Sequence, residues 1–275
     1  MTDPITSTIA TQGAKSFGAL ADRLLGPAFE YWGDQFRATL ERRESVKEVA
    51  RRAMEKTNLD DDHAIPPRVA AEVFDKAQWA ENEFLAEYLS GVLASARTKA
   101  GTNDAGVPWT ALVGRLSSDQ LALHWSVYAG FQHRFQGTDG DSFWETLHNQ
   151  LVLGYTELYS AMKWPTQQGD RNRLYAAAYG LEREGLIENL SHGQGDYLGE
   201  SVTYTRGRQY GEAKGYITFA LTQAGISLFL QAVGLGQAAF SSVFDQDVTL
   251  AIEKIDDLPE YVECVTVNDF PPLDS

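Results

Sequence analysis

The stretch from Leu174 to Gly234 decides the fold and reads LYAAAYGLEREGLIENLSHGQGDYLGESVTYTRGRQYGEAKGYITFALTQAGISLFLQAVG. Its first part repeats small and apolar residues at helical spacing. Gly185 ends this helix, because glycine readily adopts the left-handed conformation that helix termini often need. An extended segment, a long polar tip, a strand and a second helix then follow in order.

The second half of the stretch predicts a strand and a capped helix. Tyr216–Leu221 alternates in polarity, with Thr218 on the side opposite Phe219, which is typical of a half-buried strand. Thr222 is placed to cap the next helix by accepting a hydrogen bond from an exposed N–H. Apolar residues then recur at helical spacing until Gly234 stops the helix.

This order of helix, hairpin and helix is typical of the second half of a winged helix, a scaffold that binds nucleic acid or protein. The helix before the hairpin would then be the reading helix, because Arg and Asn side chains form paired contacts with base edges. The bases of the hairpin tip, Ser191–Gly215, would contact phosphates. The candidate nucleic-acid or partner-binding residues are Arg171, Asn172, Arg173, Arg183, Arg206, Arg208 and Lys214.

Both of these regions have a structural interpretation as well. The helix before the hairpin could pack on another part of the chain. The tip could be a flexible surface loop, because Asp196, Glu200 and Glu212 oppose its three bases. The alternatives for the winged helix itself are a sequence-specific DNA-binding regulator and an oligomeric adaptor that uses it as a dimerisation surface.

The net charge of -15 opposes long-range attraction to a nucleic acid. The charge is uneven along the chain: -6 over residues 1–164, -1 over residues 165–236 and -8 over residues 237–275. The stretch with the winged-helix pattern is therefore the least acidic part, although it is not basic. Protein docking is accordingly favoured over DNA reading.

We expect a mainly α protein with a small β-hairpin. The expected parts are a helical domain (1–164, with residues 1–14 disordered), a winged-helix-like domain (165–236) and an acidic tail (237–275) in which Tyr261–Val267 alternates like a strand. In the first part, helices are predicted up to about Lys56, from Pro67, over Asn82–Lys99, from Ser117 and over Phe143–Trp164, with a loop at Gly101–Pro108. Ser117 and Gln120 form a capping-box signature, with Leu116 and Leu121 as its hydrophobic staple.

Several local motifs occur together in the first part of the chain and at the end of the hairpin. They are Gly26-Pro27 before an amphipathic helix with Trp32, the basic stretch Arg42–Lys56, the helix pair around Ala77, Glu81 and Glu83, the run Tyr88–Ala96, the helix start Leu116–Asp119 and the ending Leu221–Gly225. This set resembles the abortive-infection alpha (Abi-alpha) family of bacterial proteins over most of residues 20–235. Ser118 stands where that family more commonly has Pro. The resemblance implies a role in phage defence and supplies no established catalytic mechanism.

A further candidate partner-binding surface is a basic helix in the first domain. Arg43, Lys47 and Arg51 follow each other at intervals of four and form a like-charged stripe. The stripe could meet phosphates or an acidic partner. Glu44 and Glu48 lie near enough to neutralise it, which favours a solvated helix face.

Signals for metal binding or catalysis are weak, and we expect no cofactor. Glu145 and His148 match half of a di-iron motif without a second copy, and Asp60–His63 is interpreted as an acidic loop. His124 and His133 lie among aromatic residues of one helix and are interpreted as packing residues. A single cysteine, Cys264, excludes an intramolecular disulfide and a multi-cysteine metal site. The absence of an apolar run long enough to span a bilayer predicts a cytoplasmic protein without membrane contact.

Overall fold

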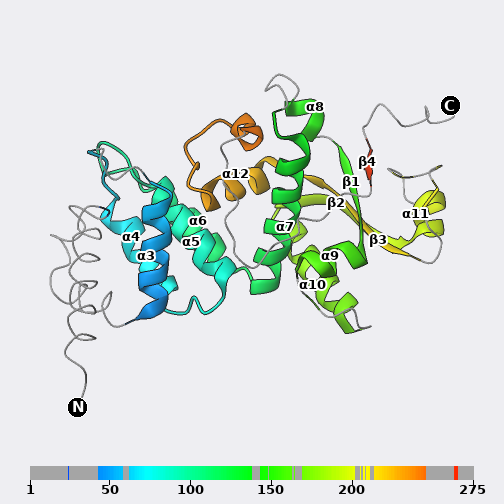
Figure 1. Ribbon diagram of the computed structural model, residues 1–275, viewed down its shortest axis with the longest axis horizontal. Coiled ribbons are helices and arrows are strands. Elements are labelled where there is room, and N and C mark those ends of the chain that lie inside the picture. The colour runs from blue at the N-terminus through cyan, green and yellow to red at the C-terminus, as the bar shows by residue number, and fades with distance from the viewer. Residues whose placement is uncertain are drawn as a thin grey trace, which may run out of the picture. The chain divides into compact units, whose positions relative to one another are not determined.

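The computed structural model describes residues 24, 43–57, 62–137, 143–147, 149–162, 164, 169–201, 205, 207, 209–210, 214–245 and 263–265. These residues belong to two compact units, whose elements are labelled in Figure 1. Unit 1 comprises residues 1–115 and 230–237, and unit 2 comprises residues 116–229 and 238–275. Each unit is described by itself.

Unit 1 is helical in its described part. Its helices are α3 (Glu44–Glu55), α4 (Pro67–Ala77), α5 (Glu83–Ser95) and α6 (Gly106–Val113). Helix α5 contacts the other three. All residues from Ala86 to Ser95 are buried, so α5 is the central helix of this unit. This central position suits residues 86–95, which are mostly apolar and contain a single charged residue, Glu87.

The helix starts of unit 1 follow local rules. Pro67 lies in the first turn of α4, where its missing N–H costs no hydrogen bond, and this start is confirmed. Asn82 caps α5 by accepting a hydrogen bond from the N–H of Phe84 at 2.8 Å. The prediction of a loop over Gly101–Pro108 is wrong, because α6 already begins at Gly106. Proline is tolerated in the first turn of a helix, so Pro108 does not prevent this earlier start.

A largely buried ion network joins α3 to α5. Lys56 Nζ lies 2.6 Å from Glu87 Oε1. It also donates hydrogen bonds to Ser90 Oγ at 2.9 Å and to the carbonyl of Ala232, in the last turn of α12, at 2.9 Å. Arg52 completes the network with a 2.9 Å bond to Glu87 Oε2. Burial lowers the pKa of Lys56, and the carboxylate of Glu87 opposes this effect.

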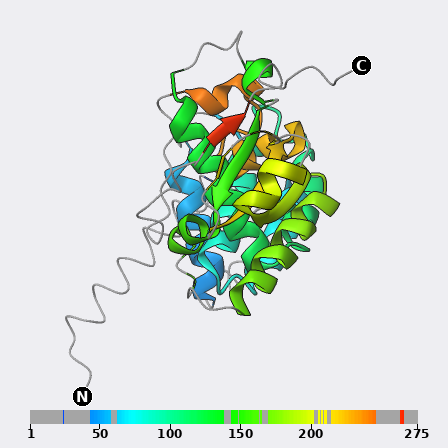
Figure 2. The same ribbon diagram turned by 90° about the vertical axis from the view of Figure 1, so that its right-hand side faces the viewer.

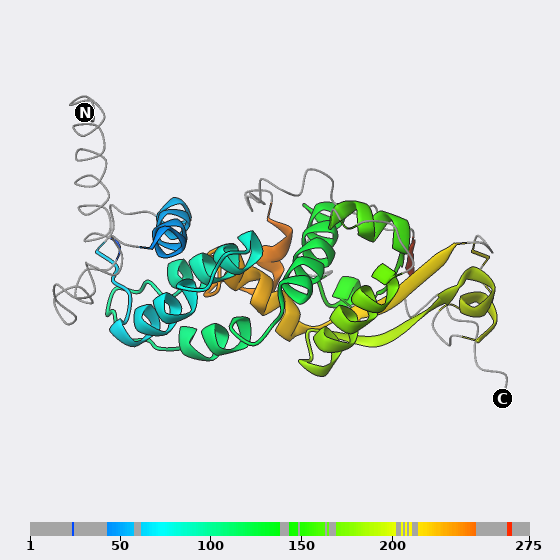
Figure 3. The ribbon, with the colours of Figure 1, turned by 90° about the horizontal axis from the view of Figure 1, so that it is seen from below.

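Unit 2 combines helices with a four-stranded sheet. Its elements are α7 (Ser118–Phe135), α8 (Phe143–Leu147), β1 (Gln150–Gly154), α9 (Tyr155–Ala161), α10 (Gly169–Arg183), β2 (Ile187–Gln194), α11 (Gly195–Ser201), β3 (Gly215–Leu221), the first part of α12 (Gln223–Ala232), the short 3-10 helix η2 (Phe240–Phe244) and β4 (Glu263–Val265). The strands lie in the order β2-β3-β1-β4, and each neighbouring pair is antiparallel. Figure 2 shows β4 beside β1, and Figure 3 shows β2 and β3 extending together toward α11.

Two predictions about the strands are wrong. Phe143–Trp164 is not one helix, because it contains strand β1, whose residues are all buried. A short apolar run that is covered on both faces has the same pattern in a buried helix and in a central strand. Strand β3 is not half-buried: Thr218 is fully buried, and its Oγ1 accepts a 2.9 Å hydrogen bond from Gln150 Nε2 on β1.

The hairpin that joins β2 to β3 also differs from the prediction. Ser191–Gln194 extends β2, and Gly195–Ser201 forms helix α11, so much of the expected flexible tip has regular structure. The hydroxyl of Thr205 donates a 2.7 Å hydrogen bond to the carbonyl of Leu198 at α11. Regular hydrogen bonding satisfies the backbone groups that a loop would leave to water.

Other local predictions about helix starts and ends are confirmed. The capping box is present, since Gln120 N donates to Ser117 Oγ at 3.2 Å and Ser117 N donates to Gln120 Oε1 at 2.7 Å. Gly185 and Gly234 end their helices at φ values of 70° and 85°. Thr222 caps α12 by accepting a 3.0 Å hydrogen bond from Gly225 N.

A buried polar cluster fastens α7 to the start of α12. Tyr128 on α7 donates a hydrogen bond to the carbonyl of Leu186 and accepts one from Thr222 N. His124 stacks on Tyr128 and lies 3.1 Å from the carbonyl of Gly225. Burial lowers the pKa of His124 to about 3, which keeps the ring neutral. His124 is therefore a packing residue, as predicted, whereas His133 is exposed.

The division into units differs from the predicted domain boundaries. Unit 2 begins at Leu116 instead of residue 165, because α7 packs against α10 and β1 pairs with β3. The segment Leu230–Gln237 belongs to unit 1, although residues 230–236 are predicted to lie in the winged-helix-like domain and Gln237 in the acidic tail. Within the described part of the chain, no helix is both long and apolar enough to span a membrane.

Candidate functional site

Helix α10 presents one exposed stripe in unit 2. Its inward residues, among them Leu174, Ala178 and Leu181, are fully buried. Four exposed residues share the opposite side at intervals of four, three and four: Asn172, Ala176, Tyr179 and Arg183. This spacing places them along one side of the helix. We call these four residues the docking face.

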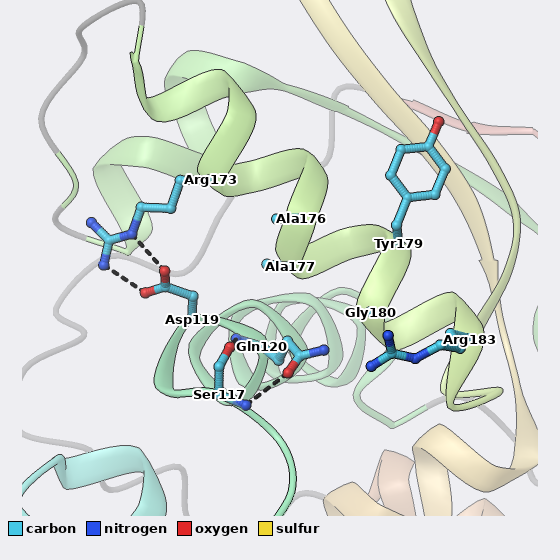
Figure 4. Close-up of a pocket in the computed structure, with 9 residues that line it drawn as sticks. All are labelled: Ser117, Asp119, Gln120, Arg173, Ala176, Ala177, Tyr179, Gly180 and Arg183. Carbon is cyan, nitrogen blue, oxygen red and sulfur yellow. Dashed lines mark hydrogen bonds and ion pairs between the residues drawn. The ribbon is translucent and has the colours of Figure 1, made fainter.

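A depression of about 410 Å³ lies beside the docking face, between α10 and the first turn of α7 (Figure 4). It is open to solvent, and its lining combines small, aromatic and charged side chains. The lining residues are Ser117, Asp119, Gln120, Arg173, Ala176, Ala177, Tyr179, Gly180 and Arg183.

The capping box of α7 forms one wall of the depression. Gln120 is 8% exposed, and its Oε1 is engaged by the backbone N–H of Ser117. Its Nε2 packs closely against Gly180, because a Cβ added to residue 180 would lie 1.8 Å from this atom. Gly180 therefore permits α10 to approach α7 closely enough to form the wall.

Arg173 is held by its neighbours within unit 2. Its guanidinium makes a two-pronged ion pair with Asp119, at 2.6 Å from Nε and 2.5 Å from Nη2 (Figure 4). It also lies 4.1 Å from the centre of the Trp164 ring. Both contacts fix the side chain between α7 and α10. Of the predicted reading-helix bases, Arg173 is thus the one that contributes to the fastening of α10.

The other predicted residues of α10 are exposed. Arg171 lies 5.8 Å from the ring centre of Tyr155, and Asn172 is exposed at the next position. The side chain of Arg183 is 75% exposed and its Nη2 is 3.9 Å from Glu184, a distance typical of a weak surface ion pair. Arg183 is therefore the cation of the depression that is available to a ligand.

An aromatic cluster lies next to the docking face. The ring of His192 on β2 stacks on Tyr175 with 3.9 Å between the ring centres, and the hydroxyl of Tyr179 lies 3.1 Å from His192 Nε2. Tyr175 and Tyr155 share a hydrogen bond of 2.8 Å. Burial lowers the pKa of His192 and raises the pKa of Tyr155, so these groups stay uncharged near neutral pH. The cluster fixes the orientation of Tyr179, which remains 51% exposed.

Only one of the three candidate bases of the hairpin lies among the described residues. Arg206 and Arg208 lie outside the described residues. Lys214, directly before β3, is exposed. Their assignment as phosphate-contacting residues of a wing therefore stays a prediction.

The basic stripe of α3, in unit 1, is neutralised by acids of the same helix. Lys47 Nζ lies 2.6 Å from Glu44, and Arg51 pairs with Glu48 at 2.7 Å and also with Glu55. The hydrogen bond from Arg51 is the main reason why the pKa of Glu48 falls to about 2.

Arg43, the first base of this stripe, has different neighbours. Its guanidinium is 5.7 Å from the ring centre of the exposed Trp79 and donates a 3.4 Å hydrogen bond to the carbonyl of Gln78. The stripe as a whole has the pairing expected of a solvated helix face.

The predicted metal-binding residues do not form a metal site in the described ranges. Among those residues no group of three His, Cys, Asp or Glu side chains could hold a metal ion. Asp60, Asp61 and His148 lie outside them, and His63 is exposed.

No family model, curated protein or solved structure matches this chain. The candidate site therefore stands on its own geometry. Sequence reasoning named Arg171, Asn172, Arg173 and Arg183 as candidates but did not connect them with Ser117 or Gln120. The capping-box signature marked those two residues as a helix start, and nothing in the sequence indicated that this start lies against α10.

Proposed function

We propose that this protein is a non-enzymatic binding protein, and that unit 2 is a winged-helix-like docking module. The observation that carries the proposal is the docking face. Asn172, Ala176, Tyr179 and Arg183 are exposed together beside a depression, on a helix whose other side is buried.

The order of elements supports a winged helix. In unit 2 the elements α7, α8, β1, α9, α10, β2, α11 and β3 follow in this order, and β3 pairs with both β1 and β2. The short helices α8 and α11 are insertions relative to a minimal winged helix. Winged helices use this order of helix, strand, two helices and hairpin. In such scaffolds the helix before the hairpin is the one that reads a partner, and here that helix is α10.

We propose a protein partner in preference to a nucleic acid. Arg173 is neutralised by Asp119, and Arg183 lies beside Glu184. The chain as a whole carries a net charge of -15, which disfavours approach to a polyanion. Tyr and Arg, both exposed on this face, are residue types that are enriched at protein interfaces.

The resemblance to the Abi-alpha family suggests the biological process in which the docking module acts. We propose that the protein acts in phage defence or in a related regulatory process in the cytoplasm. Sequence-specific DNA binding is the second candidate, because Asn172 and Arg183 are exposed and are side chains able to pair with base edges.

A phage challenge of bacteria that express the full chain tests the proposal. Wild type is expected to reduce plaque formation, and the double variant Tyr179→Ala/Arg183→Ala is expected to lose that protection. The double variant loses the contact of Tyr179 with His192 and a loose surface ion pair, so a cost of about 1–2 kcal/mol is expected and the variant should remain folded, which a thermal melt checks. The control is Trp144→Ala/Arg134→Ala, which removes an exposed aromatic residue and an exposed arginine elsewhere in unit 2.

The outcomes separate the parts of the proposal. If wild type gives no protection, the defence role is wrong. If the double variant protects as well as wild type, the docking face is not the functional surface. A titration with duplex DNA at low salt tests the second candidate. Tight DNA binding that weakens in Arg183→Ala would show that the partner of the docking face is DNA and not a protein.

A further inference from the structure

Strand β2 lies at one end of the four-stranded sheet and has an outer edge. In the described part of the chain β3 is the strand that pairs with β2, and it does so along one side. Residues Leu190–Gln194 are exposed or partly exposed. The backbone donors and acceptors on the outer edge of such a strand can pair with a further extended chain.

Two side-chain contacts fix which backbone groups of β2 point outward. The carbonyl of Asn189 accepts a 3.1 Å hydrogen bond from Gln150 Nε2, which also bonds to Thr218 Oγ1 on β3, so this carbonyl points toward the inside of the sheet. The N–H of Leu190 belongs to the same trans peptide group and therefore points the opposite way. It donates a 3.0 Å hydrogen bond to the carboxylate of Glu182 on α10.

The same alternation continues along the strand. In an extended chain the N–H and C=O of one residue point to the same side, and the side changes at each residue. Leu190, His192 and Gln194 thus direct their backbone groups outward, whereas Ser191 and Gly193 direct theirs toward β3. Within the described residues, the backbone of His192 forms no hydrogen bond to a backbone group outside the sheet.

Glu182 covers one position of this edge with a negative charge. Natural proteins use charged side chains in this way to keep open strand edges from pairing with the wrong chain. The carboxylate engages the N–H of Leu190, at the start of the outward-facing series. The outward groups of His192 and Gln194 lie further along the strand and stay available to a partner.

The charges that flank the edge indicate what kind of chain fits it. Glu188 precedes the outward-facing residues and Asp196 follows them, and both are exposed. Neither forms an ion pair with a described cation. Residues 189–195, between these two acids, contain no Asp, Glu, Lys or Arg.

This charge pattern disfavours a second copy of the chain. If two copies of β2 paired antiparallel about His192, Glu188 of each copy would lie opposite Asp196 of the other. Like charges directly opposite each other destabilise a strand pair, whereas opposite charges stabilise it. An uncharged strand with a basic residue at each end therefore complements the edge.

We propose that β2 accepts an extended segment of the partner protein as an additional strand, and that this segment carries basic residues on both sides of an uncharged stretch. Its backbone pairs with the outward groups of His192 and Gln194 and displaces Glu182 from the N–H of Leu190. The hydroxyl of Tyr179 on the docking face lies 3.1 Å from His192 Nε2, so the added strand runs beside that face. This inference rests on the proposed docking function and specifies the chemistry of the partner.

The measurement is an NMR titration of the ¹⁵N-labelled full chain with the peptide Ac-Lys-Thr-Val-Thr-Val-Thr-Val-Thr-Lys-NH2. We expect saturable shifts of the backbone amides of His192 and Gln194, and slower hydrogen exchange of the His192 amide. The same peptide with Glu in place of both Lys residues should bind at least about threefold more weakly, because it is repelled by Glu188 and Asp196. A lysine peptide with N-methyl groups on two adjacent central residues should lose most of its affinity, because neither of its edges keeps all its donors.

Gln194→Pro and Gln194→Ala form a matched pair of variants. Proline removes the outward N–H and is tolerated on an edge strand, whereas alanine keeps this N–H. Gln194→Pro should weaken binding about threefold to tenfold, the factor that corresponds to one lost backbone hydrogen bond, and Gln194→Ala should bind like wild type. Glu182→Ala should strengthen binding at least about twofold, because the carboxylate no longer competes for the N–H of Leu190.

Other outcomes overturn the inference. The absence of saturable shifts at His192, or equal binding of the lysine and glutamate peptides, would show that no basic-flanked strand is recognised. Equal affinities of Gln194→Pro and Gln194→Ala, or weaker binding by Glu182→Ala, would show that the outer backbone of β2 is not the paired surface. If a thermal melt shows that Gln194→Pro is unfolded, Glu182→Ala and the N-methylated peptide decide the question.

The peptide titration is independent of the phage challenge. A failure of strand addition would leave the docking face to be judged by Tyr179 and Arg183 in that challenge. The failure of this inference and the failure of the proposed function are therefore distinguishable.

Discussion

Replacement of the largely buried Lys56, whose side chain is 15% exposed, by methionine should destabilise unit 1 strongly. The ammonium group is bonded to the Glu87 carboxylate at 2.6 Å and to three further oxygens, those of Glu87 O, Ser90 Oγ and Ala232 O, at 2.9 to 3.1 Å. Removal of one partner from a buried ion pair typically costs 3–5 kcal/mol. Arg52 still pairs with Glu87 at 2.9 Å in the variant, so we expect the lower end, about 3 kcal/mol.

Lys47→Met provides a matched control on the same helix. Lys47 is paired with Glu44, whose side chain is 86% exposed, so this pair contributes about 0.5 kcal/mol or less. The assay is native-state hydrogen exchange of the amides of α5. A loss of about 3 kcal/mol would accelerate their exchange by about 160-fold in Lys56→Met, with little change in Lys47→Met. Equal exchange rates in the two variants would refute the assigned role of the buried network.

Two further predictions concern the polar cluster of unit 2. In Gly225→Ala the new Cβ would lie 1.8 Å from Tyr128 Oη and 2.3 Å from the carbonyl oxygen of Leu186. Because this overlap must be relieved, the melting temperature should fall by an amount equivalent to about 1–3 kcal/mol. The control Gln223→Ala changes an exposed residue and should have little effect. An unchanged melting temperature in Gly225→Ala would contradict this packing. The pKa of His124 is lowered to about 3, so below pH 6.5 the unfolded chain binds a proton that the folded chain does not. Stability should then fall by about 1.4 kcal/mol per pH unit from this residue, and its NMR ring signals should stay constant from pH 8 to pH 4.5. A ring titration midpoint near pH 6.5 would refute the burial of His124.

Local signals in the sequence predicted much of unit 2. The capping box, the glycine that ends α10 and the threonine cap of α12 each depend on a few adjacent residues, and all three are confirmed. Strand β1 was missed because its apolar run has no alternation. The run is covered on both faces, a property set by tertiary packing.

The candidate site was only partly predictable for the same reason. The exposure of Asn172 and Arg183 follows from helical periodicity. The commitment of Arg173 to Asp119 depends on a contact between residues 54 positions apart, which no local pattern encodes. The depression exists because Gly180 lets α10 lie against Gln120, and a single sequence gives no indication of that approach.

The most direct test of the docking face is site-specific photo-crosslinking in cells that express the full chain. A photoreactive phenylalanine analogue is placed at Tyr179, which is 51% exposed, or at Trp144, which is 47% exposed in the same unit. We predict a crosslink to one protein from position 179, its loss on addition of Arg183→Ala, and no such product from position 144. Crosslinking of position 179 to nucleic acid, or the same products from both positions, would contradict it.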